Sequence, residues 1–306
     1  MSTHHFNTHC PDWATALLNG FSQIFLQRDP LCGLLCLLAI LLTAPTLLGG
    51  ALLGGVAGLL TAQRRGYAKV DRQAGLFSYN GVLLGLLLSQ QFAWSAMLPL
   101  LIIASGGLSA ILTQQWLKRT RTPHCLPAYT APFVGLSWLL LSFAAPHQTA
   151  PLQLPELNTL NLLSAEFKGL GQIMLLDNPL AGALIAAGLM IANRRAAAWA
   201  LVGAGAGLTC ALLLNESSTA LLGLNGYNPA LAALAFSQQR RQPWLPVFGI
   251  ALAILLTPGF NALGLSALTA PFILACWLVR AGTRVLRQAA VDSAPCTIRE
   301  NPPRLR

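Results

Sequence analysis

Long stretches without a charged residue restrict the fold of this chain more than any other feature. They are residues 30–63, 73–117, 122–155, 178–193, 196–215, 217–239 and 242–279. A helix that crosses a bilayer needs about 20 mainly apolar residues. We assign two crossings to 30–63, 73–117 and 242–279, because each of these is interrupted near its middle, and one crossing to each of the others. The pattern predicts an all-α polytopic membrane protein with ten transmembrane helices.

The composition excludes a water-soluble enzyme. Only 9% of the 306 residues are Asp, Glu, Lys or Arg and 55% are hydrophobic, whereas a soluble domain carries about 25% charged residues. The net charge is +10, which in a soluble protein would suggest nucleic acid. Here the basic residues form short clusters between uncharged runs, as in the cytoplasmic loops of membrane proteins. We therefore expect membrane lipid around the chain and no nucleic-acid partner.

The basic residues also predict the orientation. With the N-terminus in the cytoplasm, ten crossings place every one of the 19 basic residues except Lys168 on the cytoplasmic side, in agreement with the positive-inside rule. Both termini are then cytoplasmic, and we expect a multi-pass protein of a bacterial inner membrane. The N-terminus has neither a basic region nor a small-residue cleavage site, so no removed signal peptide is expected.

The chain also contains an internal repeat. Residues 20–33 align without a gap to 169–182, residues 75–84 to 223–232, and residues 130–133 to 269–272. Three motifs thus recur in the same order at a nearly constant offset, which chance does not easily produce. Five crossings per half is an odd number, so the two halves must run through the membrane in opposite directions.

Inverted repeats place a binding site or pore near the bilayer midplane, often beside broken helices. Segments 17–27 and 166–176 are candidates for short re-entrant half-helices, because a proline follows each of them and favours the start of a new helix. The expected organisation is a cytoplasmic segment (1–16), a first five-helix repeat (17–145), an extracytoplasmic connector (146–165), a second repeat (166–287) and a cytoplasmic tail (288–306).

Neutral polar side chains are the candidate functional groups. The repeated motifs supply them in pairs: Gln23 and Gln172, Tyr79 and Tyr227, Thr130 and Thr269. A lone Thr in a span usually joins helices, but repetition at equivalent positions favours a pore. The five histidines lie in tails or loops, and no metal spacing or nucleophile–base pair occurs, so we predict no enzyme, no metal and no cofactor. A proton or ion path would require ionisable residues inside the membrane.

The doubled motifs resemble the urea transporter family. They read Gly-x-Gln-Ile/Val, Asn/Asp-Pro-x-x-Gly, Gly-Leu-x-Gly-Tyr-Asn and Thr-x-Pro-Phe, with small departures, and the resemblance covers residues 17–285. It implies a homotrimer with one pore per protomer that conducts urea passively. By this resemblance, the two glutamines bind urea at the outer sites and the two threonines face each other in the middle. Leu26 and Leu175, with Tyr79 and Tyr227, form flat slots for the planar solute.

The chemistry of urea agrees with this interpretation. Urea is planar and uncharged, and its N–H groups would cost several kcal/mol each if left unpaired in hydrocarbon. Two broader alternatives remain: a channel for other small neutral amides or polar solutes, and an ion- or proton-coupled carrier. A water or glycerol channel is disfavoured, because its signature occurs at Asn228-Pro229-Ala230 but not at the equivalent Asn80-Gly81-Val82.

Overall fold

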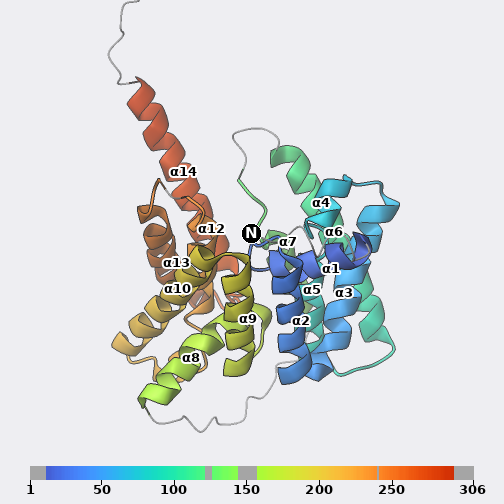
Figure 1. The fold of residues 1–306 in the computed structure, drawn as a ribbon, viewed down its shortest axis with the longest axis horizontal. Coiled ribbons are helices and arrows are strands. Elements are labelled where there is room, and N and C mark those ends of the chain that lie inside the picture. Colours follow the sequence, from blue (N-terminus) through green and yellow to red (C-terminus); the bar gives the residue numbers. More distant parts are fainter. Residues whose placement is uncertain (1–11, 121–125, 144–156, 240, 293–306) are drawn as a thin grey trace, which may run out of the picture.

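The computed structural model describes residues 12–120, 126–143, 157–239 and 241–292, and every regular element in these ranges is a helix (Figure 1). In chain order the elements are α1 (Asp12–Gln23), α2 (Pro30–Thr43), α3 (Pro45–Arg64), α4 (Lys69–Gln73), α5 (Tyr79–Gln91), α6 (Met97–Thr120), α7 (Ala131–Leu141), α8 (Thr159–Gly171), the 3-10 helix η2 (Gln172–Met174), α9 (Pro179–Ala192), α10 (Arg194–Leu213), α11 (Ser217–Leu221), α12 (Tyr227–Phe236), α13 (Trp244–Ala262) and α14 (Ala270–Asp292). The predicted all-α fold is confirmed.

Parts of all five predicted segments lie outside the described residues. These are most of the N-terminal segment 1–16, most of the connector 146–165 and most of the tail 288–306, together with 121–125 and 144–145 in the first repeat and residue 240 in the second. The described end of the connector is already helical, because α8 begins at Thr159 after Asn158, whose side chain accepts a hydrogen bond from the N–H of Asn161 at 2.8 Å.

The elements follow the sequence repeat closely. The elements α2 and α9 both have 14 residues, α3 and α10 both have 20, and the short helices α4 and α11 both have 5. Figure 1 shows α1 to α6 on one side and α8 to α14 on the other, with α2 and α9 side by side between them. These two helices pack against each other, and α7 contacts α14. The two halves therefore meet along equivalent helices.

The described residues contain fewer long helices than ten crossings require. By length and composition, α3, α10 and Met97–Arg119 of α6 could each cross a membrane. The helix α8, continued by η2, forms a broken pair with α9 that is bent by 76°. The helices α5, α7 and α12 have only 13, 11 and 10 residues. A charge-free run limits only the maximum length of a helix, and Pro45 divides one such run into α2 and α3 because proline ends the preceding helix. The ten-helix count is therefore not confirmed.

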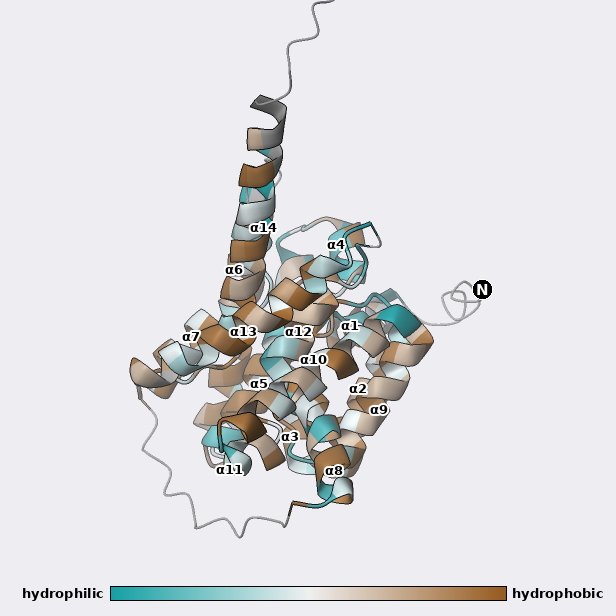
Figure 2. Ribbon diagram, turned by 90° about the vertical axis from the view of Figure 1, so that its left-hand side faces the viewer, coloured by the Kyte–Doolittle hydropathy of each residue, from teal (hydrophilic) through white to brown (hydrophobic). Residues whose placement is uncertain are grey.

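The outer surface of the helices is apolar. Large hydrophobic side chains such as Leu41, Met97 and Leu255 are exposed, and soluble monomers rarely show extended patches of this kind. In Figure 2 brown, apolar residues occur throughout the body, while teal residues gather at α4 and α11 at its opposite ends. The long apolar helices and this surface are those of a membrane protein.

Close helix contacts depend on glycine at equivalent positions of the two halves. A Cβ on Gly33 of α2 would lie 1.9 Å from the carbonyl oxygen of Leu18, and a Cβ on Gly182 of α9 would lie 1.8 Å from that of Phe167. In both places the neighbour is backbone, which cannot rotate away. Small residues of this kind let helix backbones approach each other closely in membranes.

We expect Gly33→Ala and Gly182→Ala each to destabilise the protein by about 1–3 kcal/mol, the usual cost of overpacking. The measurement is the thermal unfolding temperature in detergent. The matched control is Gly135→Ala in α7, where an added Cβ would meet nothing within 4 Å and alanine is the better helix former. Equal unfolding temperatures for all three variants would contradict the proposed role of these contacts.

Candidate functional site

The site is formed where two short turns, one in each half, bring Thr130 and Thr269 together. The Oγ1 atoms of the two threonines lie 2.7 Å apart and form a hydrogen bond, and both side chains are buried. Each threonine directly precedes a helix, α7 or α14. The residues before them, Tyr129 and Leu268, have φ angles of 45° and 43°, a left-handed conformation that non-glycine residues rarely adopt. The chain thus turns sharply at both points.

Two reciprocal hydrogen bonds join the halves beside this pair. The indole N–H of Trp138 in α7 donates to the carbonyl of Ser266 at 2.8 Å, and the indole N–H of Trp277 in α14 donates to the carbonyl of Pro127, also at 2.8 Å. The two tryptophans occupy equivalent positions after the Thr-Ala-Pro-Phe motifs. The threonine pair is therefore held from both sides.

A cavity of about 380 Å³ extends from Thr269 into the second half. Four of the residues predicted for the site line it: Gln172, Leu175, Tyr227 and Thr269. The remaining four, Gln23, Leu26, Tyr79 and Thr130, do not line this cavity. The structure thus gathers the four second-half members around one space, and Thr130 is joined to this lining through its hydroxyl bond to Thr269.

The turn after α1 and the turn after α8 have the same geometry. The N–H of Leu26 donates to the carbonyl of Gln23 at 2.9 Å, and the N–H of Leu175 donates to that of Gln172 at 3.0 Å. Both leucines have a left-handed backbone, with φ angles of 57° and 60°. Such a conformation costs about 1–3 kcal/mol and persists only where the surroundings enforce it. The turn fixes each glutamine and each leucine relative to the other.

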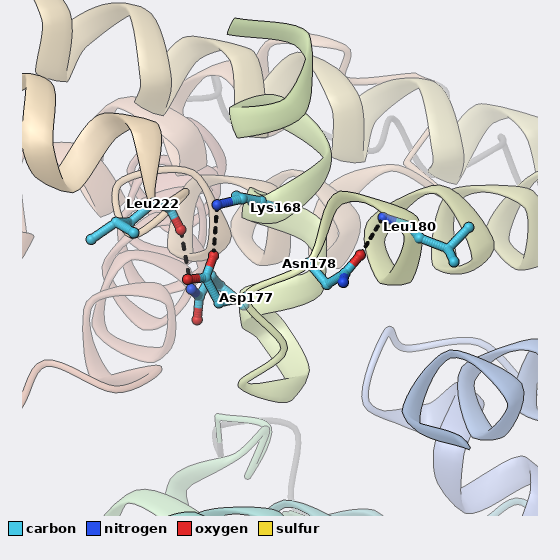
Figure 3. A network of polar contacts seen from close by, with 6 residues as sticks. Lys168, Asp177, Asn178, Leu180 and Leu222 are labelled. Atoms are coloured by element: carbon cyan, nitrogen blue, oxygen red, sulfur yellow. Dashed lines mark hydrogen bonds and ion pairs between the residues drawn. The ribbon is translucent and has the colours of Figure 1, made fainter. Parts of the chain in front are cut away.

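The helix that starts after each turn is capped in the same way. The side chain of Asp29 accepts a hydrogen bond from the N–H of Cys32 at 2.9 Å, and that of Asn178 accepts one from the N–H of Leu180 at 2.9 Å. A capping side chain followed by proline is the preferred helix start. In the second half an ion pair between Lys168 and Asp177, at 3.1 Å, also ties the two ends of the turn together (Figure 3).

The two glutamines present their amides differently. The side-chain N–H of Gln172 donates to the carbonyl of Leu222 at 3.1 Å, so its orientation is fixed while the residue lines the cavity. The Oε1 atom of Gln23 is buried and accepts no hydrogen bond from the described residues. A buried acceptor without a partner is costly.

Different side chains of the doubled motif bind the carbonyl group that precedes each threonine. The hydroxyl of Tyr79 donates to the carbonyl of Tyr129. In the second half Asn228 binds the equivalent carbonyl of Leu268 at 2.9 Å, and its Oδ1 accepts the N–H of Phe272 at 3.2 Å. Each interaction supports the sharp turn before a threonine. Tyr227 is thereby left free to line the cavity.

The sequence of this chain matches a known family over most of its length. A sequence model described as urea transporter covers residues 14–284. The chain belongs to the urea transporter family. Urea transporter 1 of Ovis aries is 28% identical over 243 residues, and urea transporter 1 of Rattus norvegicus is 29% identical over 252 residues. Both alignments cover 73% of this chain and 62% of the relative, so the chain spans about 62% of the length of these relatives.

Membership of the urea transporter family confirms the resemblance inferred from the doubled motifs. The family consists of transporters, in agreement with the prediction that the chain is not an enzyme. Together with the long apolar helices, it identifies a membrane protein. Among the residues that the structure describes, no group of three or more His, Cys, Asp or Glu could hold a metal ion.

Five polar residues of the cavity were not among the predicted site residues. They are Glu216, Thr219, Asn225, Thr257 and Ser266. Asn225 occupies the variable position of the repeated motif Gly-Leu-x-Gly-Tyr-Asn, so the motif did not indicate it as a site residue. Glu216 lies between α10 and α11, and its place at the cavity follows only from how these helices pack.

Proposed function

We propose that this protein is a passive channel for urea in a bacterial inner membrane. The observation that carries the proposal is the threonine hydroxyl pair at a cavity lined by Gln172, Tyr227 and apolar side chains, with Glu216 as its one carboxylate among the described lining residues. The names of the relatives, which are urea transporters, support the choice of solute.

The proposed pore lies between two inverted five-helix repeats, with ten transmembrane helices in all. The repeated order of elements supports this arrangement, as does the position of α4 and α11 at opposite ends of the body in Figure 2. Each short helix would stand at one mouth, α4 at the cytoplasmic mouth and α11 at the extracytoplasmic one. Both termini would be cytoplasmic, and by family resemblance three protomers would assemble, each with its own pore.

The solute would pass three polar stations. Gln172 and Gln23 would accept N–H groups of urea at the two outer stations, and Thr130 and Thr269 would do so at the centre. Leu175 and Tyr227 on one side of the centre, and Leu26 and Tyr79 on the other, would cover the flat faces of the solute. Each acceptor would offset part of the cost of removing water from urea. Binding must remain weak at every station for the solute to leave again.

We expect urea flux through this protein to be independent of ion gradients, because its cavity offers no chain of ionisable groups. Stopped-flow light scattering of proteoliposomes measures the flux, with protein-free liposomes of the same lipid as control. An uncoupler, or replacement of sodium by potassium, should leave the rate unchanged. A rate that follows either gradient would overturn the channel and establish a coupled carrier.

A further inference from the structure

Among the described residues that line the cavity, one is charged, and this side chain has no role in the proposed urea pathway. Glu216 directly precedes α11 and lines both the 380 Å³ cavity and a neighbouring cavity of about 70 Å³. Asn225 and Thr257 also line both cavities. The carboxylate therefore stands where the two spaces meet.

Within the described part of the chain, no positive charge balances this carboxylate. The ion pairs there join Lys69 to Asp12 and Lys168 to Asp177, and no Lys, Arg or His lines either cavity. Glu216 Oε2 accepts one hydrogen bond, from the side-chain N–H of Asn225 at 3.2 Å. The other side-chain atom of Asn225, Oδ1, is buried and has no partner among the described residues. The site thus combines a carboxylate that has no basic partner with an amide oxygen that has no donor among the described residues.

We propose that this cavity binds a planar cation with several N–H donors, of the guanidinium class, and that the bound cation blocks urea. The second half of this statement depends on the proposed urea channel. Guanidinium has the flat shape of urea and can donate two parallel hydrogen bonds to a carboxylate, a strong and geometrically specific pairing. The aromatic side chain of Tyr227 adds a wall that attracts cations.

The same cation cannot continue through the centre. Glu216 is the one carboxylate among the described residues that line the cavity, and the pair formed by Thr130 and the lining residue Thr269 is neutral and buried. A cation that leaves the carboxylate would lose both water and counter-charge, which is costly inside a membrane. It therefore remains in the cavity and competes with urea there.

The site is present in one half only. The helix α11 reads SSTAL and carries no charge, whereas its counterpart α4 reads KVDRQ and contains Lys69, Asp71 and Arg72. Ala68 precedes α4 where Glu216 precedes α11. The position equivalent to Glu216 therefore has no carboxylate, and the acidic residues near α4 stand among basic ones, with Asp12 paired to Lys69.

The first test is direct binding to the full chain in detergent by isothermal titration with guanidinium chloride, against sodium chloride at the same ionic strength. Glu216→Gln keeps the shape and removes the charge, so we expect binding at least about tenfold weaker. The control is Glu166→Gln, since Glu166 lies in the same half and lines neither cavity, and it should bind like the parent. Tetramethylammonium, which has no N–H donor, should not compete. Equal binding by the parent and Glu216→Gln would overturn the proposal.

The second test is urea flux in proteoliposomes with guanidinium at concentrations that occupy the site. Flux should fall in the parent and in Glu166→Gln, and the fall should require about tenfold more guanidinium in Glu216→Gln. Uptake of guanidinium itself at a rate similar to urea would overturn the block. Charge-dependent binding in a protein that shows no urea flux would contradict the urea channel and support the cation site, so the two proposals can fail separately.

Discussion

The double variant Thr130→Val/Thr269→Val is expected to reduce urea flux by about one to two orders of magnitude. Valine keeps the shape of threonine and removes the hydroxyl, so the point where the two halves meet becomes apolar. A solute N–H group that loses its partner there costs about 1–3 kcal/mol, which corresponds to this change in rate. Stopped-flow measurements on proteoliposomes give the flux, and thermal unfolding in detergent verifies that the variant is folded.

The matched control for this experiment is Thr43→Val. The hydroxyl of Thr43 donates to the carbonyl of Ala39 in its own helix at 2.7 Å, so its loss should leave the flux unchanged. If the folded double variant conducts urea at the parent rate, then Thr130 and Thr269 serve only to join α7 to α14.

The second large effect is expected for the glutamines. Gln172→Leu and Gln23→Leu keep side-chain size roughly constant and remove the amide, and each should lower flux by about one to two orders of magnitude through the loss of one polar partner worth about 1–3 kcal/mol. Gln172→Leu also loses the hydrogen bond to the carbonyl of Leu222, so its unfolding temperature should fall as well.

A matched control and two measurements separate a role of these amides in transport from a role in supporting the turn. Gln90→Leu, at an exposed position near the end of α5, makes the same chemical change away from the site and should conduct like the parent. If Gln172→Leu is less stable but transports normally, its amide only supports the turn. Normal flux in Gln23→Leu alone would show that the two halves do not contribute equivalent stations.

Local signals in the sequence predicted the parts of the fold that short-range chemistry controls. Asp29 and Asn178, each followed by proline, start α2 and α9 as helix caps. In the structure α1 ends at Gln23 and η2 begins at Gln172, and the hydroxyls of Thr130 and Thr269 meet, as the family resemblance implied. These features depend on a few neighbouring residues or on the repeat itself.

Other features depend on packing that no local pattern reports. The absence of charge could not predict that α5, α7 and α12 are short, because it constrains only where a helix can be buried. Tyr79 and Asn228 support equivalent turns with different side chains, and the repeat alone predicts equal roles. Glu216 reaches the cavity because α10, α11 and α12 bring distant segments together, which the sequence of its loop does not reveal.

The reciprocal bonds from Trp138 and Trp277 have a consequence for how fast solute can pass. A carrier turns over by rocking its two halves, and its rate rises steeply with temperature because packed interfaces must separate in every cycle. Here each half donates a hydrogen bond to a carbonyl of the other near the Thr130–Thr269 pair, so such rocking would break both bonds at once. We therefore expect a fixed passage with a low activation enthalpy. Its transport rate would be limited by how quickly a urea molecule replaces its hydration water with hydrogen bonds to the pore wall.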